Sequence, residues 1–146
     1  MSKYSLVFLR IMICFCFSSC CMFNGDPPDL IFDMEYDLIP NEGTAGQWYS
    51  PIVTVKNVSR GDCHAETTDE GAVNLKIRND SSVVVFDKNK ELISLPDGAT
   101  YTIGFDAIIE IPGIYELIFT IDKYNSTGDA YKANNVLKRT VSIGEK

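Results

Sequence analysis

Residues 112–121 read Pro-Gly-Ile-Tyr-Glu-Leu-Ile-Phe-Thr-Ile, a turn dipeptide followed by a strongly alternating stretch. Because successive side chains of a strand point to opposite faces, four large apolar groups would share one face here. These groups are Tyr115, Leu117, Phe119 and Ile121. The Pro-Gly pair favours a chain reversal, since proline presets φ and glycine tolerates positive φ. The stretch therefore predicts a strand with one buried face, which needs an opposing sheet to cover it.

The same period of two recurs along most of the chain after residue 29. It runs through residues 30–38, 52–56, 73–77, 83–86, 91–95, 101–105 and 137–143. In the first of these segments the alternation predicts a half-buried strand whose other face is acidic and solvated, with Asp33, Glu35 and Asp37. Turn-forming residues predict corners at 41–46, 79–82, 87–90 and 96–98.

Helical periodicity is missing from the chain after residue 20. Residues 58–71 and 122–134 are polar and lack an apolar period, which predicts two long exposed loops. Each predicted strand has one apolar face that must pack against another sheet. The sequence thus predicts an all-β fold, an immunoglobulin-like β-sandwich of about seven or eight antiparallel strands.

The first twenty residues have the layout of an export signal. Lys3 and Arg10 form a basic start, residues 11–17 form a short apolar run, and two serines precede Cys20. This arrangement resembles the bacterial lipoprotein signal, with Phe17 where that family usually has leucine. The resemblance implies a signal peptide at residues 1–19 and a lipid on Cys20 that anchors the protein to a membrane.

An uncleaved transmembrane anchor and an ordinary cleaved secretory peptide are the alternatives. A membrane span needs roughly 20 apolar residues, whereas Arg10 interrupts this run. Residues 20–29 contain Pro27-Pro28 and predict an extended tether, which leaves residues 30–146 as one domain. Cys21 stands where the lipoprotein family's inner-membrane retention signal has aspartate, so the expected location is the outer membrane of a bacterial cell envelope.

Charge and cysteine content exclude several classes of protein. Loss of Lys3 and Arg10 with the leader changes the formal net charge from −7 to −9. An acidic chain of this kind argues against binding to nucleic acid and fits an exported surface. The five cysteines, two of them in the leader, are too few for a disulfide framework, although a pair between Cys21 and Cys63 stays open.

Three patches, taken in order, resemble the CARDB family, a bacterial cell-adhesion-related domain with an immunoglobulin-like fold. They are Val53 to Asn57, Leu95 to Ile103, and Pro112 to Leu117 followed by Asp122 and the pair Asn134-Asn135. The resemblance covers residues 43–143. It departs from the family pattern at Tyr131-Lys132-Ala133, where members usually carry a glutamate before the paired asparagines.

Several residues are candidates for binding. Arg60 and Asp62 flank a glycine in the tripeptide that integrins recognise, within a predicted exposed loop. Trp48 and Tyr49 predict either an exposed aromatic pair for a glycan or protein partner or a cap on one end of the core. A weaker possibility is a calcium site, because Ca²⁺ takes six or more oxygen ligands and the 122–134 loop offers several. Its candidate ligands are Asp122, Asn125 and Asp129.

The residues for catalysis are scarce. His64 is the one histidine, and its neighbour Cys63 would point to the opposite face of an extended chain. We therefore expect no catalytic residues and no cofactor. The expected function is that of a non-catalytic envelope lipoprotein whose sandwich binds a protein or glycan partner. The alternatives are a hydrolase inhibitor, which would use the 58–71 loop, and a structural subunit of a surface assembly.

Overall fold

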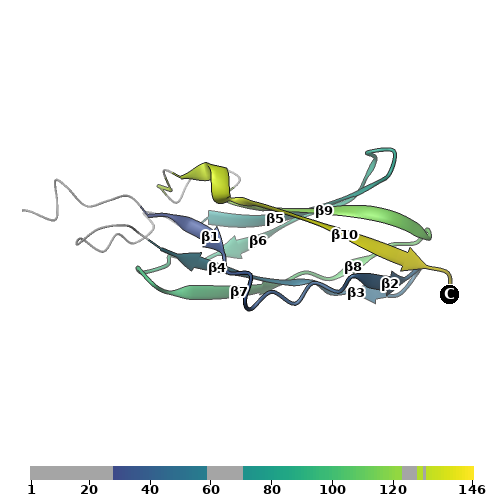
Figure 1. Cartoon of the computed structure of the whole chain (residues 1–146), viewed down its shortest axis with the longest axis horizontal. Coiled ribbons are helices and arrows are strands. Elements are labelled where there is room, and N and C mark those ends of the chain that lie inside the picture. Colours follow the sequence, from purple (N-terminus) through teal and green to yellow (C-terminus); the bar gives the residue numbers. More distant parts are fainter. Residues whose placement is uncertain (1–27, 59–70, 123–127, 130) are drawn as a thin grey trace, which may run out of the picture.

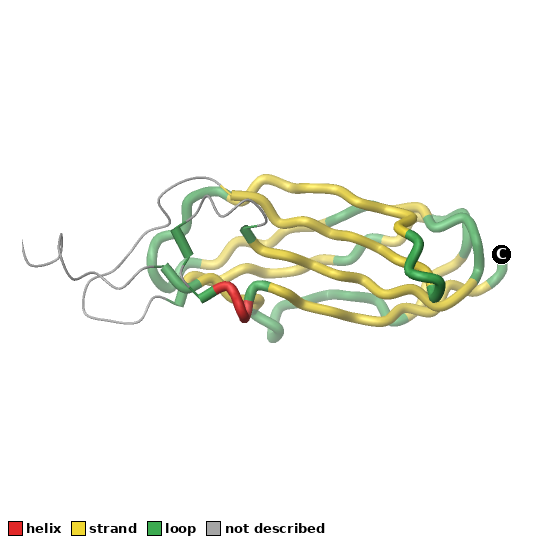
Figure 2. The backbone as a smooth tube through the Cα atoms, turned by 90° about the horizontal axis from the view of Figure 1, so that it is seen from above, coloured by secondary structure: helices red, strands yellow, loops and turns green. Residues whose placement is uncertain are grey.

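The computed structural model describes residues 28–58, 71–122, 128–129 and 131–146. These residues form ten strands and one turn of 3-10 helix, η1 (Lys132–Asn134). The strands lie in two layers that face each other along the length of the molecule (Figure 1). Seen from above, the strands of one layer run side by side along this long axis (Figure 2). The predicted immunoglobulin-like β-sandwich is confirmed.

The first layer is a five-stranded sheet with the order β2-β10-β9-β5-β6. Its strands are β2 (Glu42–Thr44), β5 (Gly71–Asn79), β6 (Val84–Leu92), β9 (Gly113–Ile121) and β10 (Val136–Gly144). The second layer contains a three-stranded sheet, β1-β4-β7, and a two-stranded sheet, β3-β8. Their strands are β1 (Leu30–Phe32), β3 (Trp48–Tyr49), β4 (Ile52–Asn57), β7 (Thr100–Gly104) and β8 (Ala107–Ile108).

The alternating stretch after Pro112 forms β9, in the middle of the five-stranded sheet. Its predicted inner residues are all buried. Phe119 joins the two layers, because its ring packs edge-on against Phe32 and Phe105 of the other layer, at centroid distances of 6.3 and 6.0 Å. Burying a side chain of this size contributes on the order of 2–3 kcal/mol relative to leaving it exposed.

One strand pair breaks the expected antiparallel pattern. Residues 42–44, predicted to be part of a turn, form β2 and pair in parallel with the end of β10. The backbone nitrogen of Ala45 continues this contact by donating to the Gly144 carbonyl at 3.0 Å. The turn predicted over 41–46 was wrong for residues 42–44, because this segment satisfies its backbone groups on the edge of β10. It was right at the end of the range, where the Gln47 nitrogen donates to the Thr44 carbonyl at 3.1 Å and Gly46 has a φ of 71°.

The two sheets of the second layer are successive parts of one antiparallel ladder. Ile52 of β4 lies opposite Gly104 of β7, and four residues earlier Trp48 of β3 lies opposite Ile108 of β8, so the register is unchanged between them. Between the two sheets the backbone nitrogen of Phe105 donates to the Pro51 carbonyl at 2.9 Å. Proline has no N–H to return this bond, so the ladder is interrupted at Pro51. Figure 1 shows β3 and β8 continuing the direction of β4 and β7.

The single strand predicted for residues 30–38 is wrong after Phe32. The chain turns at Asp33, whose carbonyl accepts a hydrogen bond from the Tyr36 nitrogen at 3.2 Å. Met34, Tyr36 and Leu38, predicted to face the core, are exposed. Asp37, predicted to be solvated, turns inward and accepts a hydrogen bond from the Thr54 nitrogen at 2.9 Å, and its burial raises the pKa of its carboxyl.

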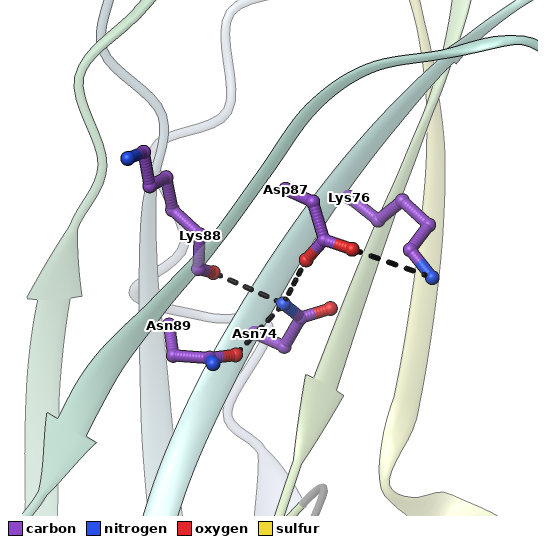
Figure 3. Close-up of polar contacts among 5 residues, drawn as sticks. All are labelled: Asn74, Lys76, Asp87, Lys88 and Asn89. Carbon is purple, nitrogen blue, oxygen red and sulfur yellow. Dashed lines mark hydrogen bonds and ion pairs between the residues drawn. The ribbon is translucent and has the colours of Figure 1, made fainter.

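A turn predicted at residues 87–90 is also wrong, because these residues lie within the continuous strand β6. Buried Asn74 of β5 holds them in place. Its side-chain nitrogen donates to Asp87 Oδ1 at 2.6 Å, to the Lys88 carbonyl at 3.1 Å and to Asn89 Oδ1 at 2.9 Å (Figure 3). Lys76 adds an ion pair to Asp87 at 3.6 Å. Polar residues that favour turns in isolation are paired across the sheet here.

The turn predicted at residues 96–98 is confirmed. The backbone nitrogen of Ala99 donates to the Pro96 carbonyl at 3.0 Å, and Gly98 has a φ of 71°, in the region that favours glycine. Among the described residues, no helix has the length and apolarity to cross a bilayer.

Candidate functional site

Among the described residues that lie on strands, Trp48 has the most exposed aromatic side chain, with 70% of its surface accessible to solvent. It lies on β3, directly opposite Ile108 of β8, which is 39% exposed. Because directly opposite residues of an antiparallel pair share a face, the indole and the isoleucine form one outward apolar pair. An exposed tryptophan on a short, regular strand pair is a candidate contact for a partner.

Two polar side chains continue this outward face toward β4 and β7. The Ser50 hydroxyl donates to Asp106 Oδ1 at 2.8 Å, so these residues bridge the same two chain segments. Both side chains are exposed. Ser50 lies two residues after Trp48, and Asp106 lies two residues before Ile108. Two residues correspond to about 6.7 Å along a strand. We call the surface formed by Trp48, Ser50, Asp106 and Ile108 the Trp48 face.

The opposite side of the same strand pair is fixed in the core. Tyr49 is only 4% exposed, and its hydroxyl donates to the Pro40 carbonyl at 2.6 Å. Burial raises the pKa of Tyr49 to about 12. The exposed pair of Trp48 and Tyr49 therefore does not form, since neighbouring residues of a strand point to opposite faces. Tyr49 caps the core and Trp48 alone is displayed.

The other predicted binding residues have different outcomes. Arg60, Asp62 and the lipidation candidate Cys20 lie outside the described residues. So does Asn125, one of the three candidate calcium ligands. Ser50, Asp106 and Ile108 were not predicted from the sequence, because local alternation does not reveal the strand pairing that brings them beside Trp48.

Asp129, another candidate calcium ligand, binds protein groups at the end of the sandwich where β1 begins. Its Oδ1 accepts a hydrogen bond from the Tyr131 nitrogen at 2.8 Å, and its Oδ2 accepts bonds from Asn135 Nδ2 at 2.8 Å and from the Leu30 nitrogen at 3.4 Å. The third candidate, Asp122, is also buried. Within the described ranges, no group of three or more histidine, cysteine or acidic side chains could hold a metal ion.

Asn57 and Tyr115, from the patches that resemble CARDB domains, also have structural roles. Asn57 is fully buried, donates to the Leu95 carbonyl at 2.9 Å and accepts from the Asp29 nitrogen at 3.4 Å. It thereby ties β1 and the 96–98 turn to the end of β4. The Tyr115 hydroxyl donates to the Ile111 carbonyl at 2.7 Å and fixes the corner before β9.

Comparison with known proteins concerns the fold. Neither a protein-family model nor a curated protein sequence matches the chain. Solved structures do match. The crystal structure of a CARDB domain from Pyrococcus furiosus, solved in complex with di-metal ions, has a TM-score of 0.57 and 16% identity. The match covers 84% of this chain and 99% of that domain.

Two further structures show the same likeness. A solution structure of the Pyrococcus furiosus CARDB domain has a TM-score of 0.56 and 18% identity, and the match covers 81% of this chain and 96% of that one. A β-glucosidase from Listeria innocua, in complex with isofagomine, has a TM-score of 0.52 and 14% identity. That match covers 80% of this chain but only 16% of the enzyme. At these identities the likeness concerns the fold alone, and the fold of this chain is that of a CARDB-like, immunoglobulin-like β-sandwich.

Proposed function

We propose that the chain is a non-catalytic binding module, held at the bacterial cell envelope by a lipid on Cys20, that engages its partner through the Trp48 face. The observation that carries the proposal is the 70% exposure of Trp48 on a strand pair whose other side is fixed by buried Tyr49. A rigid, exposed tryptophan offers a large contact area at little cost in conformational entropy. Adjacent exposed apolar side chains, as Trp48 and Ile108 are here, indicate a contact with a partner more than a single exposed residue does.

The chemistry of the Trp48 face favours a glycan. A flat indole can stack on the C–H face of a sugar ring, and neighbouring hydroxyl and carboxylate groups can bind the sugar's hydroxyls. Ser50 and Asp106 supply these groups and already hold each other in place at 2.8 Å. Aromatic area with a few oriented polar groups is the usual composition of a binding site for a small polar ligand.

A protein partner is the second candidate, and the exposed apolar side chain of Ile108, opposite Trp48, favours it. Ile108 and Ile111 are exposed in the same part of the chain. The remaining candidates are a hydrolase inhibitor that uses the 58–71 loop and a structural subunit of a surface assembly. Most of that loop lies outside the described residues.

The binding proposal can be tested with the protein's own fluorescence. Trp48 is the one tryptophan of the chain, so its emission reports on the Trp48 face alone. We would titrate the full chain carrying Cys20→Ala with soluble gluco-, chito- and peptidoglycan oligosaccharides. We expect at least one of them to cause a saturable blue shift, because a stacked sugar ring removes water from the indole.

Matched variants separate the two kinds of partner. Asp106→Asn should weaken glycan binding by at least about tenfold and Ser50→Ala by about fivefold, since a hydrogen bond to a charged group contributes about 1.5–3 kcal/mol and a neutral one about 1 kcal/mol. Lys146→Ala, at the end of the chain, is the control. If no oligosaccharide changes the emission, the glycan proposal fails. If a protein captured from the envelope binds the full chain and Trp48→Ala equally well, the Trp48 face is not the site.

The anchor needs a separate test. The full chain and Cys20→Ala would be expressed in a Gram-negative host, and intact mass and membrane partitioning would be measured. We expect a chain that begins at Cys20, carries added acyl mass and sediments with the membrane, and we expect all three properties to be lost in the variant. An unmodified soluble protein would contradict the anchor and leave the binding proposal standing.

A further inference from the structure

The two layers of the sandwich end on one side in free strand edges. β6 is the last strand of the five-stranded sheet and β7 the last strand of the three-stranded sheet. A groove of about 260 Å³ lies between these edges, lined by Lys90 and Glu91 of β6 and by residues 101–104 of β7. The groove is therefore bordered by backbone groups of two strands that have no further partner strand among the described residues.

The backbone of β7 presents hydrogen-bonding groups to this groove. At the ends of the β4–β7 pairing, Asn57 donates to the Ala99 carbonyl at 3.0 Å and Phe105 donates to the Pro51 carbonyl at 2.9 Å. In an antiparallel ladder such inward bonds alternate along the strand. The odd-numbered residues of β7 therefore bond to β4. The backbone groups of the even-numbered residues, Thr100, Thr102 and Gly104, point to the free edge.

The two edges differ in their protection against pairing. β7 reads Thr-Tyr-Thr-Ile-Gly and has no charge and no proline, which are the usual guards of a free edge. β6 carries two lysines that point inward: Lys88 lies opposite Leu75 and Lys90 opposite Val73. Leu75 and Val73 are core residues, so the lysines share the core-facing side.

Lys90 lines the groove, and Lys88 lies two residues before it on the same face of β6. Both side chains are exposed, and neither ammonium has an ion-pair partner among the described residues. In Figure 3 the Lys88 side chain runs away from the cluster of Asn74, Asp87 and Asn89 on the other face. Glu91 also lines the groove, but it lies opposite Ala72 and leaves β6 on that other face.

We propose that β7 accepts an extended acidic segment of a partner protein as an added strand, whose carboxylates pair with Lys88 and Lys90. Such a strand would lie about 4.8 Å from β7 and about 10 Å from β6, the usual spacings within and between sheets. Its backbone would bond to the outward groups of Thr100, Thr102 and Gly104. This mode of recognition is strand addition, in which backbone bonds give affinity and alternate side chains give specificity.

The spacing of the lysines matches an extended segment. Lys88 and Lys90 are two residues apart on a strand, a distance of about 6.7 Å, and alternate side chains of an added strand have the same separation. Two acidic residues with one residue between them can therefore face both lysines at once. The residues between and beside them would point outward and are free to vary.

A second copy of this chain fits the groove less well. Its own β7 has no acidic residue, so pairing of β7 with β7 would leave all four lysines without carboxylates. The chain as a whole carries a formal net charge of −7, which disfavours close approach of two copies. Charge complementarity thus favours a foreign acidic strand.

The test uses a short peptide in which glutamate and valine alternate, and a matched peptide in which lysine replaces each glutamate. Both would be added to the isotope-labelled full chain carrying Cys20→Ala, with backbone amide signals followed by NMR. We expect the acidic peptide to shift the amides of Thr100, Thr102 and Gly104 and to slow their hydrogen exchange. The lysine peptide should leave these signals unchanged.

Charge reversal provides the decisive comparison. Lys88→Glu combined with Lys90→Glu should weaken binding of the acidic peptide by at least about tenfold and allow the lysine peptide to bind. Asn89→Glu alters the other face of β6, so this variant should still bind the acidic peptide more tightly than the lysine peptide. Amide spectra of the free variants would show that each is folded. Equal binding of both peptides, shifts confined to β6, or no shift in β7 would overturn the proposal. So would concentration-dependent dimerisation through β7. Trp48→Ala should leave peptide binding unchanged, which keeps this surface separate from the Trp48 face.

Discussion

The two layers of the sandwich are stabilised in different ways. The five-stranded sheet contains four strands of nine residues each, β5, β6, β9 and β10, joined by long regular ladders. The second layer is made of strands of two to six residues. Bonds from side chains to the backbone connect its pieces: Asn57 reaches Leu95, Asp37 binds Thr54, and Tyr49 reaches Pro40.

The difference explains where the candidate surfaces lie. A long ladder satisfies its own backbone groups and leaves little surface of special shape. The short strand β3 of the second layer displays Trp48, whereas a free edge occurs in both layers, at β6 and at β7. If the second layer depends on individual side chains, single substitutions should distinguish it from the five-stranded sheet.

The largest effect is expected where the layers meet. Phe119→Ala should lower the free energy of unfolding by about 4 kcal/mol, because a fully buried ring that packs against Phe32 and Phe105 leaves a cavity. Ile114→Ala, on the same strand but exposed, is the matched control and should cost less than 1 kcal/mol, as exposed positions do. Urea unfolding monitored by circular dichroism would measure both. A cost below about 1 kcal/mol for Phe119→Ala would mean that the layers are not joined as described.

Two buried asparagines allow a direct comparison of the layers. Asn57→Ala should cost about 2–3 kcal/mol, because the change removes bonds to the buried Leu95 carbonyl and the Asp29 nitrogen. Asn74→Ala in the five-stranded sheet should cost about 1 kcal/mol, because its acceptors on Asp87 and Asn89 can turn to water. Chemical denaturation of the two variants side by side would rank them. A larger loss of stability for Asn74→Ala than for Asn57→Ala would contradict the proposed difference between the layers.

The sequence predicted β9 correctly and residues 33–38 wrongly for a physical reason. In β9 a single strand is buried on one face, so alternation of Tyr115 to Ile121 reports directly on burial. In residues 33–38 the same alternation is present, but a turn and the hydrogen bond between Asp37 and Thr54 determine the path. Local alternation carries no information about such distant partners.

The surface residues follow the same rule. Trp48 could be identified from its residue type, whereas its neighbours Ser50, Asp106 and Ile108 come together only through the register of β3 with β8. The lysines of β6 were predicted to lie in a turn, because Asp-Lys-Asn-Lys has a turn-forming composition. The bonds of Asn74 that keep this segment extended come from a different strand.

A smaller effect is expected at Tyr49. Tyr49→Phe should cost about 1 kcal/mol at neutral pH, because it removes the bond to the Pro40 carbonyl. Since burial raises the pKa of Tyr49 from 10.0 to about 12, the folded state holds the phenolic proton more tightly than the unfolded state. The stability from the neutral phenol is present below pH 10 and is lost as the pH rises toward 12.

The pH dependence supplies the measurement for Tyr49. Unfolding midpoints of the original chain and Tyr49→Phe would be compared at neutral pH and between pH 10 and 12, the window set by the shift of its pKa. The original chain should lose its advantage over the variant in this window, while titration of all other groups cancels in the comparison. Tyr115→Phe, which loses a similarly short bond of 2.7 Å to the Ile111 carbonyl, controls for the missing hydroxyl at neutral pH. A constant difference at all pH values would show that Tyr49 is not desolvated.

The smallest change in stability is expected at the residue of greatest proposed importance for binding. Trp48→Ala should alter the free energy of unfolding by no more than about 0.5–1 kcal/mol, because the indole is 70% exposed and lies opposite Ile108, which is also exposed. Thermal unfolding followed by circular dichroism would measure this change. A cost of several kcal/mol would place the indole among the residues that stabilise the second layer. A small cost leaves the exposure of this large apolar side chain without a structural benefit, which is the condition expected of a residue kept for contact with a partner.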